Sequence, residues 1–260
     1  MKDEGADQLI LNARSAVTIL GVPVQDVTMA ETLDHIGRWV AAGGAHQICT
    51  VNPEFIMAAQ NDAEFRRILN QSTLNLPDGI GVVWAAQRQG YQLRERVAGS
   101  DLIYPLAARS AKVGWRIFLL GAAEGVAEQA ALKLRALSPG VNIVGAWAGS
   151  PRLEDEAEAV RRIRAAEANI VLVAYGAPQQ DKWIARNLAQ TGARVAIGMG
   201  GSFDFVIGTQ RRAPQWIRRL NLEWLYRLLR EPWRWRRQLA LPKFVWRVVT
   251  ERRGDSGPER

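Results

Sequence analysis

Asp78 is the residue of this sequence best placed for acid–base chemistry. It follows a short apolar run, residues 73–76, and then Pro77, which ends a strand because proline has no N–H to donate. The glycines after it let the backbone turn and let another group approach closely. Residues 80–87 have a helical pattern, so the Asp78 carboxylate is either a helix N-cap or a general base at the edge of an α/β sheet.

Polar residues follow three other predicted strands. Thr50 and Asn52 end one strand and, two residues apart, share a face from which both can address one ligand. Gly176-Ala177-Pro178-Gln179-Gln180-Asp181 follows a second strand, and Asp204 follows a third after a pair of glycines. Asp204 is either a helix cap or a ligand contact. In parallel sheets ligands bind beyond the carboxyl ends of the strands, so these turns are candidate binding sites.

Arginines supply the candidate cationic groups. Arg96 precedes a helix that Ser100 or Asp101 is expected to cap, and it either helps to hold an anion at that helix start or is simply solvated. Near the C-terminus, four arginines recur every three or four residues: Arg227, Arg230, Arg234 and Arg237. They form a stripe if a helix continues past Pro232, and such a stripe is either an anion-binding face or a solvated surface.

Strands and helices alternate along most of the chain. The predicted strands are residues 47–51, 73–76, 116–120, 141–144, 169–174 and 193–197, with helical patterns between them. Apolar strands in this alternation predict an α/β fold, with a Rossmann-like, mostly parallel sheet covered by helices on both faces. Residues 121–125 resemble half of a dinucleotide-binding fingerprint, but the first glycine pair and an acidic ribose partner are missing.

The positive charge is concentrated at the C-terminal end. Residues 211–260 contain 14 Lys and Arg against 5 Asp and Glu, whereas the whole chain has 34 and 26, so residues 1–210 carry a balance of −1. Five of the ten tryptophans also lie after residue 210. We therefore predict an α/β catalytic domain over 1–210 and a basic helical appendage over 211–260. Such an appendage suits an anionic membrane surface or single-stranded nucleic acid.

Several classes of protein are disfavoured by composition. The chain has no stretch of eighteen apolar residues and its first thirty residues lack the apolar core of a signal peptide, so we expect it to stay in the cytoplasm. One cysteine, Cys49, excludes an intramolecular disulfide, and two histidines offer little for a transition-metal site. We expect no metal and no cofactor.

Taken together, five motifs in order resemble the WecG/TagA/CpsF glycosyltransferases. They are Thr50-Val51-Asn52-Pro53-Glu54, Leu76-Pro77-Asp78-Gly79-Ile80-Gly81, Arg96-Val97-Ala98-Gly99-Ser100-Asp101, Gly176-Ala177-Pro178-Gln179-Gln180-Asp181, and Arg212-Ala213-Pro214 running into Leu222-Glu223-Trp224-Leu225-Tyr226-Arg227-Leu228. The resemblance extends over about residues 17–241. The family more often has Lys-Gln-Glu at residues 179–181, which puts the lysine contact in doubt.

The resemblance implies an inverting, metal-independent transfer from a UDP-sugar donor to a saccharide carried on undecaprenyl diphosphate. Asp78 then matches the catalytic base, and the substrate-binding set is Thr50, Asn52, Arg96 and Gln180, to which we add Asp204. The appendage is expected to dock peripherally on the inner face of the cell membrane and to supply Arg227, Arg230, Arg234 and Arg237 to the leaving diphosphate. Family members also self-associate, so a homo-oligomer is possible.

The donor sugar stays open between N-acetylmannosamine, its uronate and a hexose such as glucose. An alternative function is an α/β nucleic-acid-binding protein that uses the Arg/Trp tail, but it leaves the polar turns at the strand ends unexplained. A nicotinamide-dependent oxidoreductase is disfavoured by the incomplete glycine fingerprint. The charge split also suggests that the appendage folds only at the membrane; an appendage docked on the free monomer would count against this.

Overall fold

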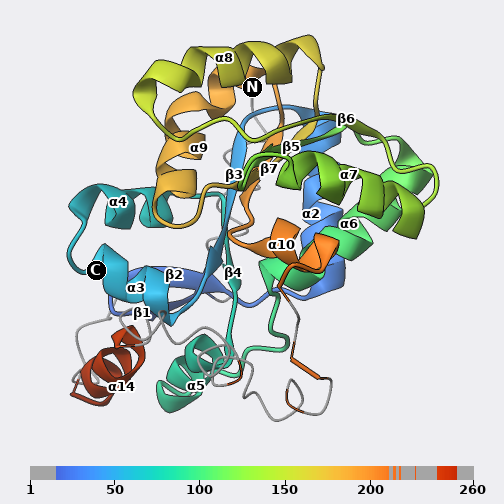
Figure 1. The fold of residues 1–260 in the computed structure, drawn as a ribbon. Coiled ribbons are helices and arrows are strands. Elements are labelled where there is room, and N and C mark those ends of the chain that lie inside the picture. Colours follow the sequence, from blue (N-terminus) through green and yellow to red (C-terminus); the bar gives the residue numbers. More distant parts are fainter. Residues whose placement is uncertain (1–15, 211–212, 215–216, 218–225, 227–238, 251–260) are drawn as a thin grey trace.

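The computed structural model describes residues 16–210, 213–214, 217, 226 and 239–250. Arg227, Arg230, Arg234 and Arg237 lie outside the described residues, so the structure does not test their predicted role. Within this part of the chain the α/β prediction is confirmed (Figure 1). The division into 1–210 and 211–260 stays a prediction.

A parallel sheet forms the centre of the described chain (Figure 1). Its six strands are β3 (His46–Val51), β4 (Leu74–Pro77), β5 (Ile117–Gly121), β6 (Ile143–Trp147), β7 (Ile170–Ala174) and β8 (Val195–Gly198). Their order is β4-β3-β8-β7-β5-β6, and every neighbouring pair is parallel. β6 begins two residues later than predicted. Parallel pairing brings the turns after β3, β4, β7 and β8 to one edge of the sheet.

An antiparallel hairpin lies beside the edge strand β4. It consists of β1 (Ala16–Ile19) and β2 (Val22–Gln25). The side chain of Gln25 accepts a hydrogen bond from the main-chain N–H of Asn75 at 2.7 Å, and the Asn75 amide donates to the Pro23 carbonyl at 2.8 Å. The hairpin therefore satisfies polar groups of an edge strand that would otherwise be open to pairing with another chain.

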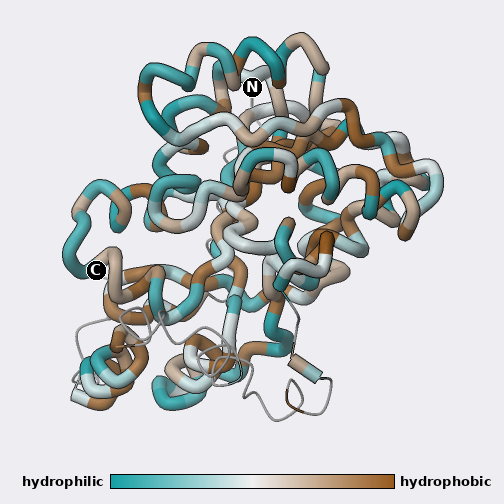
Figure 2. Tube along the Cα trace, viewed as in Figure 1, coloured by the Kyte–Doolittle hydropathy of each residue, from teal (hydrophilic) through white to brown (hydrophobic). Residues whose placement is uncertain are grey.

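Helices cover both faces of the sheet. One face packs against α2 (Met29–Ala42), α6 (Gly99–Val113), α7 (Val126–Leu137) and α10 (Ser202–Ile207). The other packs against α8 (Leu153–Ala165) and α9 (Gln179–Thr191), and at the β3 end against the hairpin, α3 (Pro53–Ala59), α4 (Ala63–Gln71), α5 (Ile80–Arg88) and α14 (Ala240–Thr250). Figure 2 shows hydrophobic residues along the strands and hydrophilic residues over the outer turns of α8.

Local signals in the sequence mark several helix starts. Thr28 and Glu31 form a capping box at α2, Asp62 caps α4, and Pro53 is the first residue of α3. The predicted cap of α6 is wrong: the helix begins at Gly99, with Ala98 as N-cap and no side-chain cap. The main-chain N–H of Val97 bonds to the Pro77 carbonyl at 3.0 Å, which attaches the chain before α6 to the end of β4.

Gly121, in the incomplete dinucleotide fingerprint, has a structural role. Its φ is 105°, and a Cβ there would lie 2.8 Å from the carbonyl carbon of Ala174. Gly121→Ala is therefore expected to lower the free energy of unfolding by about 3 kcal/mol, because backbone strain adds to a clash with backbone that has no room to move. Urea denaturation measures the loss.

The matched control is Gly90→Ala, because Gly90 also has a positive φ, 90°, but nothing lies within 4 Å of its added Cβ. Only the strain of about 1–2 kcal/mol applies there. Equal losses in the two variants would show that the close approach to Ala174 contributes nothing.

Candidate active site

The carboxyl edge of the sheet brings together residues that are far apart in the sequence. β4, β3, β8 and β7 are consecutive in the sheet, so Asp78, Asn52, the Gly198–Gly201 turn and the Gly176–Asp181 turn all follow neighbouring strands. The boundary between the β3–β4 pair and the β8–β7 pair is a topological switch point of the sheet. Ligands of α/β sheets bind at such points.

The Asp78 carboxylate does not cap α5. The N-cap of α5 is Gly79, which makes no side-chain capping bond. Instead, the half-buried Asp78 carboxylate accepts a hydrogen bond at 3.4 Å from the main-chain N–H of Gly99, the first residue of α6, and its own N–H bonds to the Val51 carbonyl at 2.8 Å. The carboxylate therefore lies between the ends of β3 and β4 and the start of α6, where a general base is useful.

Thr50 and Asn52 hold the turn after β3 in different ways. Thr50 is buried; its hydroxyl donates to the Gly198 carbonyl at 3.2 Å, and its methyl lies 3.1 Å from where a Cβ on Gly99 would be. Asn52 accepts from the N–H of Phe55 at 3.0 Å as the N-cap of α3. Its carbonyl oxygen is thus engaged, and its amide nitrogen is the group left to meet a ligand.

Gln180 organises the turn after β8. Its side chain is 1% exposed, and its Oε1 accepts from the main-chain N–H of Gly200 at 2.9 Å. A Cβ on Gly198 would lie 2.5 Å from the Gln180 amide nitrogen, so a larger residue there would force the Gln180 side chain to move. Asp78, Gly99, Thr50, Gly198 and Gln180 thus form a chain of contacts. Asn52 joins it through the preceding residue, Val51, whose carbonyl accepts a hydrogen bond from the Asp78 N–H.

Asp181 is the polar residue that our sequence interpretation missed. Its side chain is completely buried, and within the described residues neither carboxylate oxygen has a hydrogen-bond partner. Burial raises the pKa of this carboxyl to about 7, and burial together with the nearby Asp181 raises the pKa of the Cys49 thiol. The available signal was helical spacing, because Asp181 shares the inner face of α9 with Ile184 and Leu188.

Arg96 lies on the loop between α5 and α6. Its guanidinium forms an ion pair with Asp101 at 3.2 Å, and both side chains keep about a third of their surface exposed, 32% and 29%. The N–H of the next residue, Val97, bonds to the carbonyl of Pro77, immediately before Asp78. Arg96 is therefore attached to the same turn as the candidate base and stays accessible to an anion.

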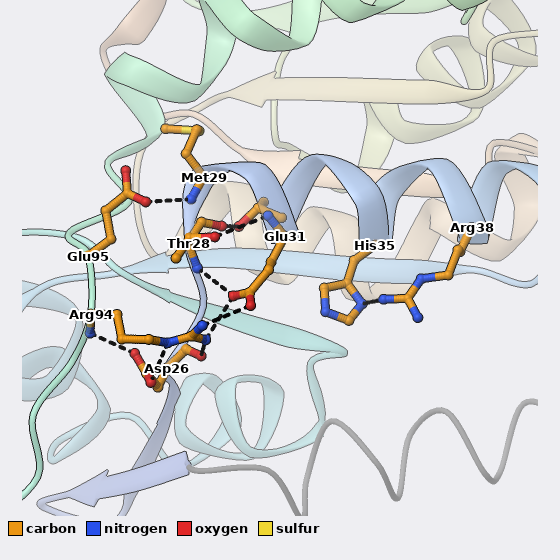
Figure 3. A network of polar contacts seen from close by, with 9 residues as sticks. Asp26, Thr28, Met29, Glu31, His35, Arg38, Arg94 and Glu95 are labelled. Atoms are coloured by element: carbon orange, nitrogen blue, oxygen red, sulfur yellow. Dashed lines mark hydrogen bonds and ion pairs between the residues drawn. The ribbon is translucent and has the colours of Figure 1, made fainter.

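A network of polar contacts fastens this loop to the start of α2 (Figure 3). Arg94 bonds to both carboxylates of Asp26 and Glu31 at 2.8 Å, and Glu95 accepts from the N–H of Met29 at 2.9 Å. The hydrogen bonds from Arg94 and from the main chain of Thr28 lower the pKa of Glu31 to about 2. Arg94 and Glu95 are the two residues directly before Arg96, so their contacts hold the loop at the point where Arg96 leaves it.

Arg94→Met is expected to speed amide hydrogen exchange at residues 95–97 about tenfold, because the loop loses both carboxylate partners while the helices on either side stay packed. Hydrogen exchange read by mass spectrometry measures this. Arg109→Met removes an ion pair between α6 and α2, with Asp34 at 3.4 Å, that does not hold the loop. An equal effect of the two substitutions would contradict the role given to Arg94.

Asp204 stands apart from this chain of contacts. It lies in the first turn of α10, after β8, and its side chain and carbonyl accept from the Thr209 hydroxyl at 3.4 and 3.1 Å. These contacts stay within the α10 segment, so the predicted substrate contact of Asp204 remains a prediction.

Two other features of the described chain concern binding. No three His, Cys, Asp or Glu side chains gather closely enough there to hold a metal ion, and none of the described helices is long and apolar enough to cross a membrane. A surface groove between α8 and α9, lined by residues such as Glu156, Arg161 and Asn187, contains none of the predicted site residues. The described residues of the predicted site gather at the carboxyl edge of the sheet and not at that groove.

Comparison with known proteins agrees with the motifs. The model of the glycosyl transferase WecG/TagA/CpsF family matches residues 17–257. A Bacillus subtilis (strain 168) protein named N-acetylglucosaminyldiphosphoundecaprenol N-acetyl-beta-D-mannosaminyltransferase is 36% identical over 235 residues, 90% of this chain and 91% of the relative. A Staphylococcus aureus (strain MW2) protein of the same name is 31% identical over 239 residues, 91% of this chain and 93% of the relative. This chain is a glycosyltransferase that belongs to the WecG/TagA/CpsF family.

Proposed function

We propose that the protein transfers N-acetylmannosamine from a UDP-sugar to N-acetylglucosamine carried on undecaprenyl diphosphate, in the synthesis of a bacterial surface polysaccharide. The observation that carries this proposal is the place of Asp78, whose carboxylate lies at the carboxyl edge beside the start of α6. The names of the Bacillus and Staphylococcus relatives favour this donor sugar and acceptor among those considered from the sequence.

Asp78 acts as the base in this proposal. Its carboxylate takes the proton from the acceptor hydroxyl as the hydroxyl oxygen attacks the anomeric carbon of the donor sugar, and the bond from that carbon to UDP breaks on the opposite face. A single displacement inverts the anomeric centre, so an α-linked donor gives a β-linked product. The relatives' names specify a β-linked product.

The leaving diphosphate needs positive charge and hydrogen-bond donors. The start of α6 carries the positive end of the helix dipole, and Arg96 is three residues before Gly99, the first residue of that helix. Arg227, Arg230, Arg234 and Arg237 are proposed to add charge from the appendage, in place of a divalent metal. The transfer is therefore expected to persist in EDTA.

The described helix of the appendage has a face suited to a membrane. On α14 the exposed side chains include Val245 at 44%, Trp246 at 66% and Val249 at 46%, with Leu239 at 46% just before the helix and the exposed cation Lys243 between them. Aromatic and aliphatic side chains beside basic ones favour the headgroup region of an anionic bilayer. We therefore propose peripheral association with the inner face of the cell membrane.

The test of the reaction is acceptor-dependent UDP release. The full chain is incubated with lipid-diphosphate-linked N-acetylglucosamine, a panel of UDP-sugars and EDTA, and the product linkage is read by NMR. Turnover with UDP-N-acetylmannosamine and a β-linked product are expected. Turnover only with another UDP-sugar would change the donor, a requirement for added metal would refute metal independence, and failure with all donors would refute the proposal.

Trp246→Ser is expected to weaken binding of the full chain to vesicles containing phosphatidylglycerol about tenfold, since a large interfacial ring is lost. Co-sedimentation with the vesicles measures the binding. Leu132→Ser on α7 removes a side chain of similar exposure, 65%, from another surface and serves as the control. Equal weakening by both variants, or stronger binding to a single-stranded oligonucleotide than to the vesicles, would contradict the membrane proposal.

A further inference from the structure

Helix α14 lies beside α3 and α5 and packs against both (Figure 1). Phe244, the fifth residue of α14, is close to Gly81 at the start of α5, whereas Arg88 at the end of α5 donates to the Val249 carbonyl at 3.5 Å. Arg247 also donates at 3.3 Å to Gln60, the C-cap of α3. The three helices therefore run in roughly the same direction, with Phe244 next to the starts of α3 and α5 and the end of α14 next to their ends.

Those two starts are the catalytic turns. α3 begins directly after Asn52, and α5 begins two residues after Asp78. A Cβ on Gly81 would lie 2.6 Å from Cγ of Pro53 and 3.7 Å from the Phe244 ring. The absence of a side chain at Gly81 thus lets the two turns approach each other, and Phe244, only 1% exposed, packs where they meet.

The Asp78 turn is held by hydrogen bonds and by packing against the Asn52 turn. Its bonds run from the Asp78 N–H to Val51, from the Val97 N–H to Pro77 and from the Gly99 N–H to the Asp78 carboxylate. Gly79 has a φ of 104° and no side chain to pack, and a Cβ there would be 3.8 Å from Pro53 and 3.9 Å from Cβ of Asn52. A large buried ring at this junction limits how far the turns can separate.

We propose that Phe244 is a positioning residue for the transfer reaction, holding the Asn52 and Asp78 turns at the separation that lets both side chains meet one substrate. This inference rests on the proposed function. It gives the start of α14 a role in catalysis that is separate from membrane binding, because Phe244 is buried whereas Trp246 lies exposed on the same helix. Loss of the ring leaves a space into which either turn can relax, and a small displacement of reacting groups slows a reaction strongly.

Val248 provides a matched control. It is 4% exposed and lies one helical turn after Phe244 on the same buried face of α14. Its neighbours along the helix, Arg247 and Val249, contact the far ends of α3 and α5. Val248→Ala therefore loosens the docking of α14 away from the catalytic turns, and Phe244→Leu keeps most of the buried volume at the turns.

The experiment compares the three full-length variants in the UDP-release assay and in hydrogen exchange. Phe244→Ala is expected to lower kcat about tenfold or more with less than a threefold change in donor KM, Phe244→Leu to recover most of kcat, and Val248→Ala to stay within about twofold of wild type. Amides in residues 52–55 and 79–82 are expected to exchange faster in Phe244→Ala than in Val248→Ala. Equal effects of the two alanine substitutions on kcat and on exchange would overturn the proposal, since Phe244 would then only help to dock the helix.

The exchange measurement separates this inference from the proposed function. In one outcome, no UDP-sugar reacts with wild type, but exchange at residues 52–55 and 79–82 still depends on Phe244 and not on Val248. The proposed transfer reaction is then wrong, whereas the coupling of Phe244 to the two turns holds. If wild type turns over and Phe244→Ala changes neither kcat nor exchange at the turns, the reaction stands and the coupling is refuted.

Discussion

Asp78→Asn is expected to lower the rate of sugar transfer by about 10²- to 10⁴-fold while the protein stays folded. Asparagine has nearly the same shape and keeps an oxygen that can accept the 3.4 Å hydrogen bond from the Gly99 N–H, and the main-chain bond to Val51 is unaffected. What the substitution removes is the ability to take a proton from the acceptor hydroxyl. Acceptor-dependent UDP release measures the rate, and thermal unfolding checks the fold.

The control for this experiment is Asp34→Asn, which makes the same chemical change at a surface ion pair on α2. It is expected to leave the rate within about twofold of wild type, since an exposed ion pair contributes little to stability. If Asp78→Asn keeps more than a tenth of the wild-type rate, Asp78 is not the base. Its carboxylate would then serve mainly to hold the start of α6.

Asp181→Asn is expected to stabilise the protein at pH 8, by up to about 4 kcal/mol. Burial raises the pKa of Asp181 from 3.8 to about 7, which is about three pKa units at 1.36 kcal/mol each. Between these two values the folded state keeps the proton and the unfolded state has lost it. The contribution of Asp181 to the free energy of unfolding therefore falls as pH rises from about 4 to 7, and levels off above 7.

Asparagine is neutral at every pH and does not carry this cost. The difference in free energy of unfolding between Asp181→Asn and wild type should be small near pH 4 and should grow up to pH 7, as measured by urea denaturation at several pH values. Taking the difference cancels the opposite pH dependence of carboxylates with lowered pKa, such as Glu31 and Asp62. A difference that does not change with pH would mean that Asp181 is ionised in the folded protein.

The docking of α14 bears on how the appendage works. Helix α14 belongs to the predicted appendage, and it is packed against α3 and α5 in the free chain through the buried side chains of Phe244 and Val248. For residues 240–250, this packing counts against the hypothesis that the appendage folds only at the membrane. The buried face holds the helix on the enzyme, and the face with Trp246 is left for the proposed membrane contact.

Much of the fold was predictable because its signals are local. The strands are short apolar runs, and the caps by Thr28, Asn52 and Asp62 depend on a side chain and N–H groups only three residues away. Once the alternation indicated a parallel sheet, the carboxyl edge followed, and with it the neighbourhood of Thr50, Asn52, Asp78 and Gln180. The family resemblance rested on the same motifs.

The partners of those residues were not predictable, since they come from distant parts of the chain. The Asp78 carboxylate meets Gly99 because the chain after α5 returns to bond with Pro77, and Asp181 is buried because α9 packs its inner face on the sheet. The sequence by itself determined the order of strands and helices, the polar turns at the strand ends and the basic C-terminal segment, each of which depends on residues close together in the chain. Only the tertiary structure decided that Asp78 is no helix cap, that Asp181 is buried without a described partner and that Phe244 packs near the turns of Asn52 and Asp78, because contacts between distant segments depend on how the helices pack.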